Sequence, residues 1–354
     1  MPLNPNFWTT HVGSVPYLDV KQICETLVTR IDMPAWPQFP RRKFRENMYV
    51  QFSPALPALK FDESDEKIYF ITTGGDFNSF LEEFYAKYLA DDFKAFGLLP
   101  ENAAGFFALL DNLRQNPREW VKGQVTGPIS MGLTITDQDL RASLYNELLE
   151  DVLIKNCSMN ARWQIQELYS VSPNVVLFVD EPYMSSFGSA FISLSEFQVT
   201  SALNEVFTAI HSEGALAGVH CCGNTDWSVL LKTEVDILNL DAYGYIEHLA
   251  LYPEDLRAFL DRDGILAWGI VPNNADIFKE TPLSLSQRLL SGFDLISQKA
   301  KRRGVTIEPE EFFSHSLITH SCGLGPATIE IADRSFDMLI ELGETLRNRT
   351  LSIS

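Results

Sequence analysis

Basic residues are scarce in this chain: 28 lysines and arginines stand against 47 aspartates and glutamates, which gives a net charge of −19. This balance is the opposite of a nucleic-acid-binding surface, so we expect no nucleic-acid partner. The sequence also has no apolar run long enough to span a bilayer and no basic and apolar signal segment at its start. We therefore expect no membrane contact and a cytoplasmic location.

Cysteines are few, odd in number and widely scattered: Cys24, Cys157, Cys221, Cys222 and Cys322. Such a set favours a reducing compartment and metal or catalytic roles over disulfides. A Gly-x-Gly-x-x-Gly motif after a first strand is also missing, which argues against a dinucleotide-binding Rossmann unit. We see no linker and no internal repeat. Because the 45% hydrophobic content is ample for one core, we predict a single domain over residues 1–354.

From residue 121 onward, short apolar runs alternate with amphipathic helical stretches. Together with a first strand that begins at Trp8 and one near residues 48–52, these runs make eight strands. Alternation of this kind predicts an α/β fold, a closed (β/α)₈ TIM barrel, with N-terminal insertions that include a hairpin strand at 68–73. An open doubly wound sheet is the alternative. The other predicted strands are residues 121–126, 175–180, 217–222, 236–241, 265–271 and 316–322.

Polar side chains gather where the predicted strands end. In a (β/α)₈ barrel the carboxyl ends of the strands form one rim, and that rim carries the active site. Packing alone gives no reason to end so many strands with an acid, an imidazole or a thiol, so the pattern predicts a site at the rim. The residues concerned are His11, Thr126, Asp180, His220, Cys222, Asp241 and Cys322.

The strongest metal-binding signal is the apolar run 217–224, in which His220 and Cys222 lie two positions apart. Alternate residues of a strand point to the same side, so these side chains should project together while Cys221 packs on the opposite side. Cys322 ends another apolar run and supplies a second thiol. One imidazole and two thiolates are typical zinc ligands. The alternative is two unrelated patches of buried cysteine.

A catalytic zinc site has three protein ligands and keeps a fourth position open. Asp241 ends the strand after the His-Cys strand and is our choice for a displaceable fourth ligand, although a hydrogen-bonding role is nearly as good an explanation. His320, two residues before Cys322, is a rival ligand. A zinc ion with two thiolates suits a third sulfur: a thiol that binds there loses its proton and can attack an electrophilic carbon.

Two further positions suit an amino-acid substrate. Ser14 lies in a Gly-Ser turn after the first strand, where backbone N–H groups can hold a carboxylate; a simple loop start is the alternative. Asp180 ends the strand at 175–180 and could hold an ammonium group, or it could cap the next helix. Glu181 is expected to face the opposite way.

Five short segments resemble motifs of one family. In chain order they are similar to motifs of the catalytic half of cobalamin-independent methionine synthase, which belongs to a superfamily with uroporphyrinogen decarboxylase and the coenzyme M methyltransferases. The resemblance covers the whole chain and implies the short core form of that enzyme. The segments are Val12-Gly13-Ser14-Val15-Pro16, Val125-Thr126-Gly127-Pro128, Val179-Asp180-Glu181-Pro182, His220-Cys221-Cys222 and Cys322-Gly323-Leu324.

For the substrate, the resemblance implies homocysteine, with its carboxylate at the Val12–Ser14 turn and its amino group on Asp180. The family's Gly-Glu segment, whose glutamate also holds the amine, is matched only by Glu46. The chain lacks the duplicated N-terminal half that helps the full-length enzyme to bind polyglutamyl folate. The resemblance therefore implies a methylated corrinoid as donor, either methylcobalamin or a corrinoid protein, and methionine as the product.

For the metal, the resemblance implies zinc bound by His220, Cys222 and Cys322. The family's zinc-binding glutamate falls on Asp241, which is one methylene shorter, so coordination by this residue is an open question. Three rival functions also stay open: methyl transfer to another thiol such as coenzyme M, a metal-free enzyme like uroporphyrinogen decarboxylase, and a non-catalytic accessory protein that binds a corrinoid or a metal.

Overall fold

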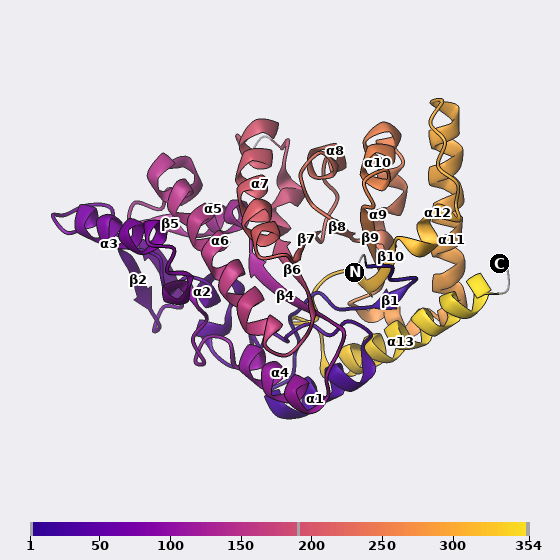
Figure 1. The fold of residues 1–354 in the computed structure, drawn as a ribbon, viewed down its shortest axis with the longest axis horizontal. Coiled ribbons are helices and arrows are strands. Elements are labelled where there is room, and N and C mark those ends of the chain that lie inside the picture. Colours follow the sequence, from indigo (N-terminus) through magenta and orange to yellow (C-terminus); the bar gives the residue numbers. More distant parts are fainter. Residues whose placement is uncertain (1–2, 190–191, 352–354) are drawn as a thin grey trace.

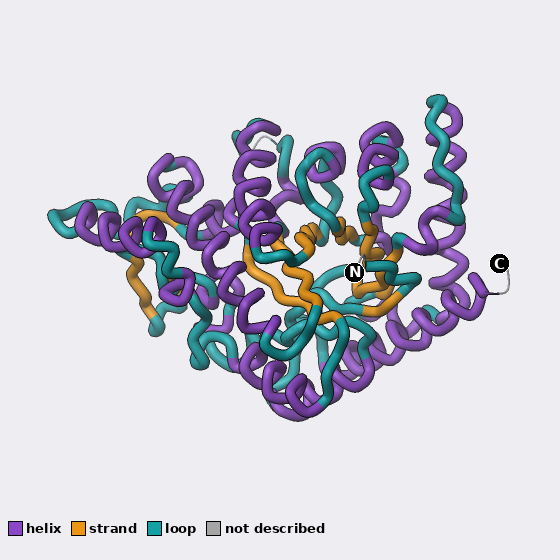
Figure 2. The backbone as a smooth tube through the Cα atoms, viewed as in Figure 1, coloured by secondary structure: helices purple, strands orange, loops and turns teal. Residues whose placement is uncertain are grey.

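The centre of the computed structural model is a curled sheet of parallel strands; the structure describes residues 3–189 and 192–351. Over these residues the sheet has seven strands in the order β1-β10-β9-β8-β7-β6-β4. Figure 1 and Figure 2 show helices around the outside of this curl. The strands are β1 (Trp8–Thr9), β4 (Trp120–Thr126), β6 (Asn174–Asp180), β7 (Leu216–Cys221), β8 (Ile237–Leu240), β9 (Ile265–Val271) and β10 (Ser316–His320).

The strands are mostly apolar, as parallel strands covered by helices are expected to be. Every residue of β4, β8, β9 and β10 is buried. All six strands predicted from residue 121 onward are present, and their ends agree with the prediction to within two residues. The alternating apolar runs therefore predicted this part of the sheet correctly.

The predicted strand near residues 48–52 is wrong, because this stretch forms the short helix α2 (Met48–Gln51). The side chain of Asn47 accepts a hydrogen bond from the N–H of Tyr49 and so starts the helix. With this strand gone, the prediction of a closed eight-stranded barrel is also corrected. Within the described residues the seven strands form a TIM-like half-barrel and not a closed barrel.

An irregular segment lies between the two edge strands of the half-barrel. The N–H of Met33 donates to the carbonyl of Thr9 in β1, and the N–H of Lys122 in β4 donates to the carbonyl of Pro34, both at 3.0 Å. Ala35 adds one parallel bridge to Lys122. Prolines 34, 37 and 40 have no N–H to donate, so this segment cannot continue as a strand.

The helices follow the strands in βα alternation. Asn146 starts the long α6 by accepting hydrogen bonds from two backbone N–H groups, so this helix begins at Glu147. The helices are α1 (Val20–Arg30), α3 (Phe77–Leu89), α4 (Ala104–Gln115), α5 (Pro128–Thr134), α6 (Glu147–Tyr169), α7 (Glu196–Ser212), α8 (Trp227–Leu231), α9 (Ala242–Leu249), α10 (Pro253–Leu260), α11 (Pro282–Arg302), α12 (Glu311–Ser314) and α13 (Ile329–Leu351).

A small second sheet lies beside the half-barrel, together with α3 on the left of Figure 1. Its strands β2 (Leu59–Asp62) and β3 (Lys67–Phe70) form an antiparallel hairpin, and β5 (Thr136–Asp137) joins β3 in parallel. The predicted insertion hairpin is thus confirmed. None of the helices in the described part of the chain combines the length and the apolarity that a bilayer span requires.

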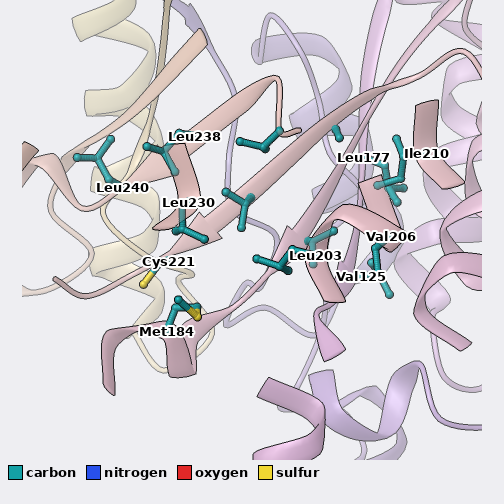
Figure 3. Packing of buried hydrophobic residues seen from close by; sticks show 14 of the residues in the cluster. Val125, Leu177, Met184, Leu203, Val206, Ile210, Cys221, Leu230, Leu238 and Leu240 are labelled. Carbon is teal, nitrogen blue, oxygen red and sulfur yellow. The ribbon is translucent and has the colours of Figure 1, made fainter. Parts of the chain in front are cut away.

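One large cluster of buried apolar side chains fills the space between the sheet and the helices. Figure 3 shows part of it, with Leu203, Val206 and Ile210 of α7 among the strand residues. Cys221 belongs to this cluster and is fully buried. Its position agrees with the alternation along β7, which turns Cys221 away from the side on which its two neighbours project.

Candidate metal centre

Three predicted ligands meet at the carboxyl end of the sheet. His220 lies in β7, Cys222 directly follows this strand, and Cys322 lies two residues after β10. Their ligand atoms, one ring nitrogen and two Sγ atoms, all lie within 4.8 Å of one another. The structure therefore brings together side chains that are a hundred residues apart in the sequence.

The ring of His220 has one nitrogen engaged and one available. Nδ1 lies 2.6 Å from Oδ1 of Asn239 in β8, so it carries the proton and donates it. Nε2 is buried and has no hydrogen-bond partner among the described residues. A buried nitrogen lone pair is costly unless something binds it. This arrangement suits a metal ion, because histidine ligands commonly donate their second N–H to a fixed acceptor.

The two thiols influence each other strongly. The hydrogen bond from Cys322 and the neighbouring His220 lower the pKa of Cys222, and the same contact with Cys222, together with burial, raises the pKa of Cys322. The pair therefore favours a single thiolate when it is alone. Both sulfurs can ionise together only if a cation compensates the second charge, and this is the situation that a divalent metal provides.

A cavity of about 500 Å³ opens onto these three residues. Pro40, Met48, Tyr49 and Pro182 contribute apolar surface to its wall. The cavity has room for a small molecule. It is also lined by the predicted substrate residues Val12, Ser14, Glu46 and Asp180.

Two carboxyl groups in this wall each have an oxygen that nothing in the described residues satisfies. These atoms are Oδ1 of Asp180 and Oε2 of Glu46, both buried. Burial raises the pKa of Asp180 to about 6, against the opposing effect of Lys122 and His220. Burial also raises the pKa of Glu46 to about 7, against Arg42 and Lys43. Two such oxygens on one cavity suit a ligand ammonium group.

The turn at Val12–Ser14 contacts the segment that directly follows Cys322. The N–H of Leu324 donates to the carbonyl of Ser14 at 2.9 Å, and the N–H of Gly325 donates to its Oγ at 3.3 Å. Gly13 between them has φ +152°, and a side chain there would collide with Gln38. The turn is therefore held against the segment that carries Cys322.

Asp241 and His320 lie outside the group of three ligand atoms. Asp241 starts α9, and its Oδ1 accepts a hydrogen bond from the N–H of Gly244 at 2.8 Å. His320 is buried with its ring 4.9 Å from the ring of Phe336 and perpendicular to it. Burial lowers the pKa of His320 to about 4.

Two residues of the site were missed in the sequence. Lys122 is buried in β4, and its Nζ donates to the carbonyl of Val12 at 2.8 Å. Asn239 in β8 accepts the hydrogen bond of His220. Both interrupt apolar strand sequences with a polar residue. That interruption is the signal that could have drawn attention to them.

Comparisons with known proteins find a similar fold among solved structures but identify no sequence family. No protein-family model and no curated protein matches the chain. Among solved structures it is similar to a B12-independent methionine synthase from Shewanella sp. W3-18-1 in complex with selenomethionine, with TM-score 0.57 and 15% identity over 99% of both chains. It also matches ZgEngAGH5_4 in complex with a cellotriose, at TM-score 0.40 and 8% identity over 96% of both chains, a likeness too weak for argument.

The first likeness shows that the chain has a methionine-synthase-like fold over its whole length. It agrees with the fold that the motif resemblance implies. It gives no support to the expected corrinoid donor or corrinoid-protein partner, because the similar structure is a B12-independent enzyme.

Proposed function

We propose that this protein is a zinc-dependent methyltransferase that methylates the thiol of homocysteine and forms methionine. One observation carries the proposal: the ligand atoms of His220, Cys222 and Cys322 lie within 4.8 Å of one another on the wall of a cavity that also contains Asp180 and Glu46. The likeness to a methionine synthase solved with selenomethionine supports the same substrate class.

Zinc held by these three residues would leave one position for the substrate sulfur and would lower the pKa of that thiol, which makes it a nucleophile at neutral pH. His220 would bind through Nε2, since Nδ1 already donates to Asn239. The fit is good because a nitrogen and two sulfurs form a common ligand set for zinc. Asp241 is no part of this set in our proposal, because its carboxylate caps α9.

The rest of the cavity would hold the amino-acid end of homocysteine. The free oxygens of Asp180 and Glu46 would accept hydrogen bonds from its ammonium group. The turn at Val12 and Ser14 would face its carboxylate, as the motif resemblance implies. Apolar side chains such as Met48 would cover the short carbon chain and keep water from the sulfur.

The test is a methyl-transfer assay with the zinc-loaded protein, homocysteine and two classes of donor, a methylated folate and methylcobalamin free or on a corrinoid protein. Formation of methionine that depends on zinc with either donor would support the proposal. Absence of methionine with every donor, from a protein that binds zinc, would overturn the proposal and leave two rivals, methyl transfer to another thiol and a non-catalytic protein. A protein that takes up no zinc would favour the metal-free rival.

A further inference from the structure

Asn239 makes three hydrogen bonds with its side chain, and all three are buried. Its Oδ1 lies 2.6 Å from Nδ1 of His220. Its Nδ2 donates to the carbonyl of Ala267 at 2.7 Å and to Oγ1 of Thr319 at 2.9 Å. The residue is 2% exposed. Among the described residues the other ring nitrogen of His220, Nε2, has no hydrogen-bond partner and lies near the two thiols.

These contacts determine which way the amide points. The carbonyl of Ala267 can only accept a hydrogen bond, so the atom of Asn239 that faces it must be the NH₂ group. The amide oxygen therefore faces His220 and can only accept. As a result the imidazole proton lies on Nδ1, and the lone pair lies on Nε2, the nitrogen that is free for a metal.

The same contacts join the two halves of the candidate metal centre. They run from His220 on β7 through Asn239 on β8 to Ala267 on β9 and Thr319 on β10. Thr319 in turn lies three residues before Cys322. The amide of Asn239 thus links β7, which carries His220 and leads to Cys222, to β10, which leads to Cys322.

We propose that Asn239 is a positioning residue for the metal centre: it holds His220 in the tautomer that binds metal and fixes the spacing between the strands of Cys222 and Cys322. The inference rests on the proposed zinc site. Removal of a hydrogen-bonding partner of this kind lowers metal affinity about 10- to 100-fold, because the ligand is then no longer held in the tautomer and orientation that bind the metal.

The experiment compares zinc affinity, by competition with a chromophoric chelator, in the parent protein and in Asn239→Leu. Leucine has the same branched arrangement of four side-chain heavy atoms, although its methyl groups are larger, and it cannot accept the proton of Nδ1. We expect affinity to fall about 10- to 100-fold with one zinc still bound at saturation. The second readout is a long-range ¹H–¹⁵N spectrum of the metal-free proteins, which should show the Nδ1–H tautomer of His220 in the parent and a mixture in the variant.

The matched control is Ser316→Ala, which removes two other buried hydrogen bonds at β10, the one from Trp268 and the one to the carbonyl of Phe312, and does not touch His220. It should leave both the affinity and the tautomer unchanged. If Asn239→Leu does not fold, Thr319→Val removes one of the two contacts that orient the amide and should lower affinity by a smaller factor.

The outcomes separate this inference from the proposed function. Zinc binding in the parent with equal affinity and an unchanged tautomer in Asn239→Leu would overturn the positioning role alone. Equal losses in Asn239→Leu and Ser316→Ala would also overturn it, because the effect would then be general destabilisation. A parent protein that binds no zinc would overturn the proposed function, and with it the role assigned to Asn239.

Discussion

The ammonium group of Lys122 donates a hydrogen bond of 2.8 Å to the carbonyl of Val12, inside the curl of the sheet. Its Nζ also lies 3.3 Å from Oε1 of Gln124 and 4.7 Å from the centre of the Phe178 ring. Burial lowers the pKa of Lys122 to about 8, and the nearby Asp180 opposes this effect. The lysine therefore holds the start of the Val12–Ser14 turn while its charge is poorly solvated.

We expect Lys122→Met to weaken methionine binding and to leave stability nearly unchanged. The lowered pKa means that the buried charge costs on the order of 3 kcal/mol at neutral pH. The orphaned carbonyl of Val12 would cost about 1–3 kcal/mol, so the two changes in the free energy of unfolding nearly cancel. Asp180 would lose a neighbouring cation and hold its proton more tightly, which should raise the Kd for methionine about tenfold, or about 1.4 kcal/mol.

Urea unfolding and calorimetric titration with methionine measure these two quantities. Lys60→Met is a suitable control, because this lysine lies exposed on β2 and does not line the cavity. It should change neither of them. A large loss of stability in Lys122→Met, or an unchanged Kd for methionine, would show that this account of Lys122 is wrong.

The sheet could be predicted from the sequence because its signal is local. The run Ile265–Val271 is apolar throughout, and a strand buried on both faces requires just that. The alternation that places His220 and Cys222 on one side, with Cys221 on the other, follows from strand geometry alone. These features predicted the seven observed strands and the three residues that meet at their carboxyl ends.

Other features depend on contacts that no local pattern encodes. The stretch at Met48 has the composition of a strand, but the capping side chain of Asn47 makes it a helix. The proline-rich segment around Ala35 occupies the gap between the edge strands through single hydrogen bonds. The roles of Lys122 and Asn239 become visible only when neighbouring strands are in register, since their partners lie on other segments.

Removal of one sulfur should abolish tight zinc binding. We expect the parent to bind one zinc per chain. In Cys322→Ser the zinc affinity should fall more than about 100-fold, because loss of a ligand should cost more than loss of a residue that is hydrogen-bonded to a ligand. Zinc at 100 times its Kd should also stabilise the folded parent by about 2.7 kcal/mol, and a chelator should reverse this gain. Metal analysis and thermal unfolding measure both effects.

Cys221→Ala is the matched control for this experiment, because Cys221 is the neighbour of a ligand and packs into the apolar cluster instead. It should lose some stability from the smaller side chain and keep its zinc affinity. Loss of zinc in Cys221→Ala, or full retention in Cys322→Ser, would contradict the assignment of ligands.

Ligand binding should depend on pH through Glu46. Its pKa is raised to about 7, so the carboxyl group is mostly protonated below this value and cannot attract an ammonium group. The affinity for methionine should therefore increase as the pH rises from 6 to 8. Methionine is the better probe because it has no thiol to titrate. Glu46→Gln should bind methionine more weakly and lose this part of the pH dependence.

The same shift predicts a pH dependence of stability with a definite sign. The pKa of Glu46 is higher in the folded protein than the ordinary value of 4.5, so the folded state holds the proton more tightly. Its contribution to stability is full below about pH 4.5 and is lost as the pH rises through about 7. Between pH 4.5 and 7, the free energy of unfolding in urea should therefore decrease less in Glu46→Gln than in the parent. An equal decrease in both proteins would contradict the raised pKa of Glu46.

Asp180 and Glu181 are neighbours in sequence, and we expect their substitutions to have different effects. Glu181 accepts hydrogen bonds from the N–H of Ile129 and from both the N–H and Oγ of Ser130. These contacts tie the end of β6 to the start of α5. Glu181→Ala should therefore destabilise the fold by about 2–4 kcal/mol, because several buried donors lose their acceptor. Its zinc affinity should not change.

Asp180→Asn should instead fold normally and discriminate between acceptors. Its Oδ1 has no partner in the described residues, so little stability depends on it. If this oxygen holds the ammonium group of homocysteine, the variant should raise KM for homocysteine about tenfold or more, the loss of one charge-assisted hydrogen bond. A thiol without an amino group, such as coenzyme M (2-mercaptoethanesulfonate), should react equally slowly with parent and variant. Equal KM values for homocysteine would instead mean that the acceptor carries no ammonium group, and coenzyme M would become the better candidate.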